Sequence, residues 1–267
     1  MEIFGYLGAL LVGLSLGIFG AGGSIITIPV LIYCFRVEPL HATTYSFFIV
    51  GSTALIGAVR HIAKGTVKVM PALYFAVSGI IVIYLIRTFV IQFIPEVLFT
   101  IHNTAITKEL MILLFFAVVM TLAGISMIRS ESNPSRVPVA SDLTTFLSLS
   151  MLGLAVGIVI AFAGVGGGFL ITPALVLFAR LPVKTAIGTS LCIICINSFV
   201  GFFSSFHLHS DIDWQFLFVF ISITAAGILM GAFVSKKINS EKLRRVFGWF
   251  VLLMGIFIIL NELFLNV

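Results

Sequence analysis

Charged residues are scarce in this sequence: Asp, Glu, Lys and Arg together make up only 9% of its 267 residues. Hydrophobic residues make up 60%, and the mean hydropathy is +1.24. A single soluble domain of this length cannot bury so much apolar surface in its core. The composition therefore excludes a soluble globular protein and predicts an integral membrane protein.

Carboxylates are absent from the long apolar blocks. All ten acidic residues lie at block ends or between blocks. Proton and cation transporters usually carry carboxylates within the membrane. An integral membrane enzyme acting on a lipid or a sulfur compound would need a clustered acid, base or nucleophile. We therefore expect a protein that is not an enzyme and whose substrate is an anion.

Cysteine is also rare. The odd count and the intramembrane positions of Cys34, Cys192 and Cys195 disfavour a disulfide framework. A loop at 207–213 holds two His and two Asp at a spacing that would seat a metal, but an ordinary solvated loop explains it better. We expect neither a metal nor a cofactor. The net charge of +5 comes from residues at span ends, which indicates a lipid bilayer and not nucleic acid as the partner.

Long uncharged stretches dominate what is present. About 20 apolar residues cross a bilayer as a helix, and backbone groups in lipid must be satisfied within the segment. The sequence therefore predicts an all-α, multi-pass membrane protein with about eight hydrophobic blocks. These blocks are Ile3–Phe35, Ala42–Val59, Val69–Ile86, Leu110–Ile128, Leu143–Ala179, Thr185–Phe206, Trp214–Ser235 and Val246–Asn261.

Two glycine-rich breaks, 144 positions apart, interrupt two of these blocks at Gly17–Pro29 and Ala161–Pro173. Gly20, Gly22, Gly23 and Pro29 of the first fall on glycines and a proline of the second. The same offset pairs further residues on either side of the breaks. The chain therefore consists of two homologous membrane repeats, which we place at 1–128 and 143–267, joined by a polar linker at 129–142. Repeats with glycine-broken spans at corresponding positions are typical of secondary transporters.

Each broken block is too long for one crossing, since 33 residues make about 50 Å of helix. We expect each to be a re-entrant hairpin that turns at its glycines. The distribution of Lys and Arg favours this interpretation: it leaves Arg36, Arg87 and Lys108 on one face and the other twelve of the 15 basic residues in the cytoplasm. The two repeats are then inverted. Parallel repeats, with each block crossing once, remain the alternative. The connection at 87–109 is compatible with a short interfacial helix or a loop.

The glycine breaks are the first candidate binding site, because a helix that begins within the membrane offers free N–H groups and a positive dipole end to an anion. Ser24 is a typical N-cap residue and is expected to cap a half-helix over Ile25–Phe35. Gly168 precedes the second half-helix, Phe169–Ala179. Close helix packing is the alternative role for the glycines. The candidate donors are Gly22, Gly23, Ser24, Gly166, Gly167 and Gly168.

A polar stripe on the helix that follows each hairpin is the second candidate. Ser46, Thr53 and Gly57 share one helical face, and Ser190, Asn197 and Gly201 repeat the pattern 144 residues later, with Thr189 beside Ser190. These side chains either complete an anion's shell or hydrogen-bond neighbouring helices. Arg36 and Arg180 form a repeat-related basic pair, which either attracts anions to the two mouths or extends to lipid headgroups.

These motifs resemble the sulfite exporter (TauE/SafE-type) permease family. The resemblance rests on the double glycine break, on AIGTS at Ala186–Ser190 and on IDW at Ile212–Trp214. The first half matches more loosely, with Ala42-Thr-Thr-Tyr-Ser46 at the corresponding position. The family's signature falls on Gly20, Gly22, Gly23, Gly164, Gly166, Gly167, Gly168, Gly188, Thr189 and Ser190.

The resemblance implies a transporter of small sulfur-containing anions, such as sulfite, thiosulfate or organosulfonates, in the cytoplasmic membrane of a prokaryote. Alternating access between two inverted repeats would carry the anion. A passive anion channel of the same architecture is the alternative. Import and export, any coupling ion and a homo-oligomeric state are all compatible with the sequence.

Overall fold

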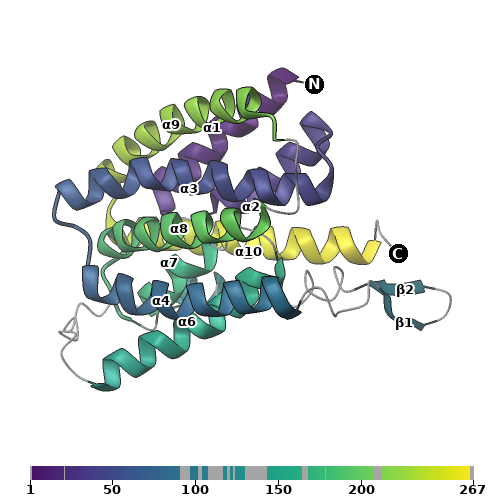
Figure 1. Cartoon of the computed structure of the whole chain (residues 1–267). Helices are drawn as coiled ribbons and strands as arrows, with labels where there is room; N and C mark the ends of the chain where they lie inside the picture. Colours follow the sequence, from purple (N-terminus) through teal and green to yellow (C-terminus); the bar gives the residue numbers. More distant parts are fainter. Residues whose placement is uncertain are drawn as a thin grey trace.

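The computed structural model describes residues 2–20, 22–90, 97–101, 104–107, 117–118, 121–122, 124–129, 143–163, 168–177, 179–206 and 212–264. Its helices are stacked in layers (Figure 1), with α3 and α8 in the middle, α1 and α9 on one side, and α4 and α6 on the other. The helices are α1 Glu2–Phe19, α2 Gly23–Pro29, η1 Val30–Cys34, α3 Pro39–Ala63, α4 Val69–Leu85, η2 Ile86–Val90, α6 Leu143–Ala163, α7 Gly168–Leu177, α8 Val183–Phe206, α9 Trp214–Lys237 and α10 Ser240–Phe264.

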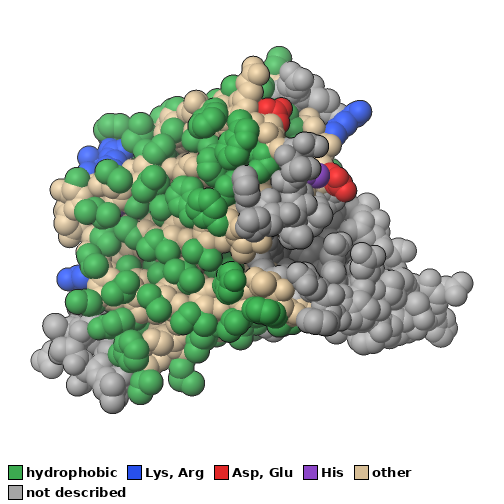
Figure 2. Space-filling view, in the orientation of Figure 1, with side chains coloured by type: hydrophobic (Ala, Val, Ile, Leu, Met, Phe, Trp, Pro, Cys, Tyr) green, Lys and Arg blue, Asp and Glu red, His purple; other side chains and the backbone are tan. Residues whose placement is uncertain are grey.

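The outer surface has the character that lipid requires. Four of the described helices are long and apolar enough to cross a membrane, over His41–Ala63, Val69–Val90, Val183–Ser204 and Trp214–Lys237. Hydrophobic side chains cover the visible face (Figure 2), and the Lys and Arg side chains lie at its margins. The prediction of a multi-pass, helical membrane protein is thus confirmed at this level.

The first glycine break reverses the chain. Gly8 packs against Val30 and Gly23 against Leu16, so the helix after the break runs back along α1. The turn uses Gly20 and Gly22, whose φ angles of 64° and 86° are in the left-handed region that glycine adopts without penalty. In the second repeat, α6 ends at Ala163 and α7 begins at Gly168. Gly164, Gly166 and Gly167 lie outside the described residues.

The expected cap at Ser24 is wrong. Gly22 is the N-cap residue and α2 begins at Gly23, so Ser24 lies within the first turn. With Gly22 in the left-handed conformation, the helix begins two residues earlier than it would with Ser24 as its N-cap. The half-helix then continues through Pro29 into the wider turn of η1, since proline has no N–H to donate.

Both half-helices end in the same way. Arg36 and Arg180 have left-handed φ angles of 56° and 50°. The N–H of Val37 donates to the carbonyl of Leu31 (3.0 Å), and the N–H of Leu181 donates to that of Leu175 (3.1 Å). This bond closes a Schellman-type helix end, and its two copies lie 144 residues apart.

Helices that correspond at the 144-residue offset pack in a reciprocal pattern. Helix α1 packs on α9, and its repeat equivalent α6 packs on α4. Helices α3 and α8, which are themselves equivalent, run antiparallel: Gly201 packs on Phe47, whereas Gly57 packs on Leu191. At the 144-residue offset, Phe47 corresponds to Leu191 and Gly201 corresponds to Gly57, so the two contacts are equivalent. Exchanging the repeats therefore leaves these contacts unchanged.

The connection at 87–109 differs from the expected interfacial helix or loop. It contains η2 and a small antiparallel hairpin of β1 Val97–Ile101 and β2 Thr104–Thr107. Thr100 pairs with Ala105, and Ile101 pairs with Thr104. The two strands are rich in β-branched residues, which favour extended backbone. Within the next apolar block, Gly124 packs closely on Leu252 of α10.

Candidate substrate site at the hairpin tips

The first hairpin tip is held by side chains of the second repeat. The Ser190 hydroxyl donates to the carbonyl of Gly20 at 2.8 Å. The Thr172 hydroxyl lies 2.9 Å from Ser190 Oγ and 3.2 Å from the same carbonyl. Both side chains are fully buried. Ser190 was expected at a site, whereas Thr172 was missed because its position in the repeat is occupied by Ile28.

Glycine at position 20 makes this contact possible. A Cβ there would lie only 2.7 Å from the Cα of Ile187 and 2.8 Å from its carbonyl oxygen, both backbone atoms of α8. The tip therefore approaches α8 more closely than a side chain would permit. The AIGTS segment supplies the receiving surface, since both Ile187 and Ser190 belong to it.

The start of α2 is buried beneath aromatic rings. Gly22 and Gly23 are both buried. The Phe250 ring would lie 3.0 Å from a Cβ at Gly22. Phe19 stacks on Phe247 and Phe250 of α10, with ring centroids 4.9 Å and 5.5 Å apart. The first turn of α2 contains no acidic residue, and its N-cap provides no side-chain hydrogen bond. This helix terminus is thus positive, apolar in its surroundings and shielded from solvent.

The polar stripe does not converge on one point. Because α3 and α8 run antiparallel, Ser46 lies beside the end of α8 near Gly201, whereas Ser190 lies beside Gly57 of α3. The two serines are therefore about twelve residues of helix apart, or about 18 Å. Thr53 is turned toward α9, where its hydroxyl lies 2.7 Å from that of Thr224. Asn197 is turned toward α4 and lies next to Gly79. Thr53 thus makes the interhelical bond that was the alternative to a binding role.

Asn197 differs from Thr53 because its amide has no hydrogen-bond partner in the described ranges. The residue is 1% exposed. Among the described residues, neither Asn197 Nδ2 nor Oδ1 makes a hydrogen bond, and the same is true of Ser46 Oγ and Ser198 Oγ. An unsatisfied buried amide costs stability, so such a group is rarely kept without another use.

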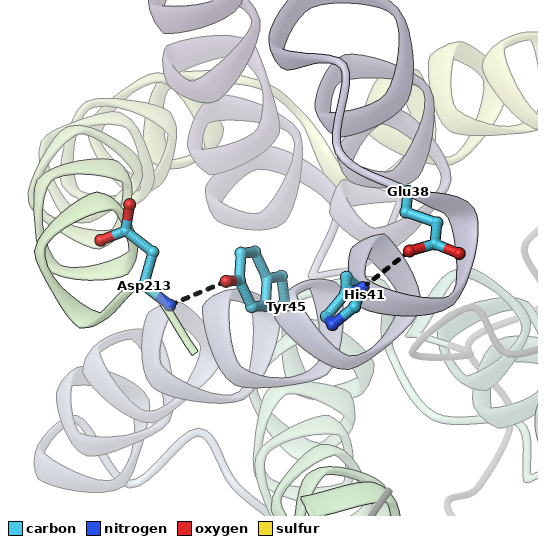
Figure 3. Close-up of polar contacts among 4 residues, drawn as sticks. All are labelled: Glu38, His41, Tyr45 and Asp213. Carbon is cyan, nitrogen blue, oxygen red and sulfur yellow. Dashed lines mark hydrogen bonds and ion pairs between the residues drawn. The ribbon is translucent and has the colours of Figure 1, made fainter. Parts of the chain in front are cut away.

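Two hydroxyls at equivalent positions bind the beginnings of the outer helices. Tyr45 Oη accepts the N–H of Asp213, just before α9, at 2.8 Å, and Figure 3 shows the ring reaching across to it. Thr189 Oγ1 accepts the N–H of Lys68, just before α4, at 3.1 Å. Tyr45 and Thr189 lie 144 residues apart. We call these two bonds the Tyr45 latch and the Thr189 latch.

The latches lie at opposite ends of the α3–α8 pair. Beside the Tyr45 latch, His41 Nδ1 lies 3.3 Å from Glu38 Oε2 (Figure 3). Beside the Thr189 latch, His61 Nδ1 lies 2.9 Å from Thr66 Oγ1, and the ring packs on Gly188. In the sequence, Tyr45 stands out only as part of the looser match over Ala42–Ser46. The repeat offset, which aligns it with Thr189, was the signal that could have identified it.

The remaining predicted site residues lie away from the first tip. Arg36 and Arg180 are exposed at the ends of the half-helices. From Gly23 to Arg36 is about 13 residues of helix, or about 20 Å. Within the described residues no group of three His, Cys, Asp or Glu side chains is placed to hold a metal. Asp213 instead accepts the N–H of Phe216 and caps α9, while His207, His209 and Asp211 lie outside the described residues.

Comparison with known proteins agrees with this architecture. The family model described as "Sulfite exporter TauE/SafE" matches residues 6–258. The chain belongs to this family. A probable membrane transporter protein of Xylella fastidiosa (strain 9a5c) is 31% identical over 260 residues, covering 93% of this chain and 91% of its own.

More distant relatives carry the same description. The probable membrane transporter protein YdhB of Bacillus subtilis is 24% identical over 234 residues, covering 86% of this chain and 87% of its own. No solved structure matches the chain. The family and its relatives identify a multi-pass membrane transporter, and their names indicate a transporter and not an enzyme.

Proposed function

We propose that this chain is a secondary transporter that moves a small sulfur-containing oxyanion, such as sulfite, thiosulfate or an organosulfonate, across the cytoplasmic membrane of a prokaryote by alternating access. The observation that carries the proposal is the buried start of α2, at Gly22 and Gly23, which has no side-chain cap and no acidic residue in its first turn. A helix N-terminus in a low-dielectric site attracts an anion through its N–H groups and its dipole.

Because Ser46 and Ser190 lie about 18 Å apart, the proposal places a separate anion shell at each tip, made of the tip's N–H groups and the hydroxyls nearest to it. Backbone N–H groups at Gly22, Gly23 and Ser24 act as donors in the first repeat, and those at 166–168 act in the second. Thr189 and Ser190 belong to the first tip, since Ser190 already binds Gly20. By the repeat offset, Ser46 belongs to the second. Asn197 contributes its amide, and Arg36 and Arg180 draw anions to the mouths.

We further propose that the two repeats, at 1–128 and 143–267, are inverted. The antiparallel packing of the equivalent helices α3 and α8 supports this, as does the return of α2 along α1. So does a basic group: Lys236 lies close enough for its charge to act on Lys64, and Arg60 and Lys236 lie over the same Phe233 ring. If each broken block crossed the membrane once, these two lysines would lie on opposite faces.

Alternating access is supported by the two latches. Each is a single hydrogen bond between a central helix and the start of an outer helix, and each lies at one end of the central pair. Releasing one latch while keeping the other would open the molecule on one side only. A passive channel would need both ends open together.

A transport assay tests the proposal. In proteoliposomes loaded with unlabelled sulfite or thiosulfate, uptake of the labelled anion should saturate and should be stimulated by anion on the other side. A thermal-shift series with sulfite, thiosulfate, sulfate, taurine and sulfoacetate identifies the substrate. Flux that is not stimulated from the other side would favour the channel, and no flux or thermal shift with any of these anions would refute the substrate class.

A matched pair of variants ties the activity to the tip. Ser190→Ala removes the hydroxyl that holds the Gly20 carbonyl. Ser204→Ala removes a hydroxyl of the same helix whose hydrogen bond, among the described residues, stays within that helix and goes to the carbonyl of Gly201. We expect the first variant to lose most of the transport and the second to retain it.

A further inference from the structure

Two basic side chains lie over one aromatic ring on the outer surface of the molecule, and a third basic side chain lies near them. The Arg60 guanidinium carbon lies 4.6 Å from the centre of the Phe233 ring, and Lys236 Nζ lies 5.5 Å from it. Arg60 Nη1 also donates to the carbonyl of Leu229, at 3.3 Å. Lys64 completes the group, since the charges of Arg60 and Lys236 both act on it. We call these residues the Phe233 cluster.

Among the described residues, no acidic side chain forms an ion pair with the cluster. Burial, Arg60 and Lys236 together lower the pKa of Lys64 below its ordinary value of 10.5. Every charged group acting on Lys64 is positive, and the ion pairs of the described residues lie elsewhere, at Glu38 and Glu241. Two ammonium groups cannot hydrogen-bond each other, because neither has an acceptor. An anion between them would supply one.

The surroundings of the cluster are apolar and face outward. Phe233 is 60% exposed and Met230 52%, on α9, and Val59 is 58% exposed on the adjacent α3. These side chains continue the exposed hydrophobic surface that runs along the layers, and Lys and Arg side chains gather at one end of that surface (Figure 2). A ligand that matches the cluster would therefore place an anionic group against the cations and an apolar part along α3 and α9.

We propose that the Phe233 cluster is a binding site for an anionic phospholipid, with the lipid phosphate between Arg60, Lys64 and Lys236 and the acyl chains along the outer faces of α3 and α9. A free inorganic anion would satisfy the charges but leave the apolar face uncovered, so the geometry favours the lipid. Basic groups at the ends of transmembrane helices recognise anionic headgroups in this way. The cluster shares no residue with the proposed anion shells, so it does not depend on the proposed transport function.

Native mass spectrometry of the purified full chain in a neutral detergent tests the proposal. With equal amounts of phosphatidylglycerol and phosphatidylcholine, the wild-type protein should retain the anionic lipid preferentially. Lys64→Gln/Lys236→Gln should reduce that preference about 25-fold, at about fivefold for each basic residue. Lys64→Arg/Lys236→Arg should keep it. The control is Lys184→Gln, an exposed lysine on α8 that does not act on Lys64.

A thermal-shift measurement separates the lipid from a free anion and from misfolding. Without lipid, Lys64→Gln/Lys236→Gln should melt no lower than wild type, because it removes repulsion between like charges. Phosphatidylglycerol should raise the melting temperature of the wild type more than that of this variant, and inorganic phosphate should raise neither. An equal rise in both proteins, or an equal rise with inorganic phosphate alone, would overturn the proposal.

Discussion

At the scale of single residues, Gly20 and Gly65 form a natural comparison. Both have left-handed backbone, with φ angles of 64° and 65°. A Cβ at Gly20 would meet the backbone of Ile187, whereas nothing lies within 4 Å of a Cβ at Gly65. The two positions therefore share a conformational requirement but differ in packing.

Replacing each glycine by alanine separates these effects. Both variants should lose about 1–2 kcal/mol to the left-handed conformation. Gly20→Ala should in addition displace the tip from α8 and abolish transport, while Gly65→Ala should remain active. Melting temperature and counterflow, measured at equal membrane levels, check this. Full activity of Gly20→Ala would mean that the approach of the tip to α8 is not required for transport.

Asn197 separates a binding role from a packing role. Its amide is buried and has no hydrogen-bond partner in the part of the chain that the structure describes, so Asn197→Leu should leave the melting temperature unchanged or higher. If the amide binds the anion, the variant should bind it more weakly by about 1–3 kcal/mol, the value of a hydrogen bond to a charged group. Thr53→Val is the matched control: it breaks the bond to Thr224 and should lower stability with little effect on the dissociation constant. An unchanged constant for Asn197→Leu would remove it from the site.

Arg36 and Arg180 combine a strained backbone with an exposed charge. Arg36→Gly should raise stability by about 1 kcal/mol, because glycine adopts the left-handed conformation freely. If the charge attracts the substrate, the same variant should raise KM. Arg36→Ala removes the charge but keeps the strain, so it should show the KM change without the stabilisation. Equal KM values in all three proteins would leave Arg36 with a purely structural role.

At the scale of helices, the two latches should act in opposite directions. A Ser46→Cys reporter, in a background without Cys34, Cys192 and Cys195, lies next to the Tyr45 latch and replaces a fully buried side chain. Tyr45→Phe should increase thiol labelling of this reporter, because it favours opening at that end. Thr189→Val should decrease it, because it favours the other state. Changes of the same sign in both variants would argue against alternation.

The same scale shows how far the sequence determines the fold. The apolar blocks predicted the described helices, and the first glycine-rich break predicted the turn at Gly20–Gly22. The block Leu110–Ile128 lies partly outside the described residues. The cap at Ser24 was wrong, because propensity favours serine whereas the left-handed turn needs Gly22. The strand Val97–Ile101 was missed, since a short apolar run has no period that separates strand from helix.

The candidate site was less predictable than the fold. The helical period predicted that Ser46 and Thr53 share one face of their helix, and that Ser190 and Asn197 share one face of theirs. Which hydrogen-bond partner each side chain meets depends on the neighbouring helices. Thr53 hydrogen-bonds Thr224 on α9, and Ser190 donates to the carbonyl of Gly20. Asn197 has no hydrogen-bond partner among the described residues. Such partners lie more than 150 residues away for Thr53 and Ser190, so no local pattern reveals them.

At the scale of the whole molecule, the inverted arrangement makes a prediction about sides. A hairpin that returns to its own side and three further crossings give each repeat an odd number of crossings. The first repeat would then start outside and end inside, and the second would do the reverse. The proximity of Lys64 and Lys236 fits this arrangement, because both residues would lie in the cytoplasm.

Labelling in whole cells tests this topology. A cysteine introduced at position 135, in the linker between the repeats, should react with a membrane-impermeant thiol reagent only after the cells are opened. Cysteines at Lys64 and Lys236 should behave in the same way, and a tag after Val267 should be accessible from outside. Parallel repeats with single crossings predict instead that positions 64 and 135 react in intact cells while position 236 stays protected. Because Lys64 and Lys236 lie close together, a result that places them on opposite faces would refute both the inverted arrangement and the packing of α3 against α9.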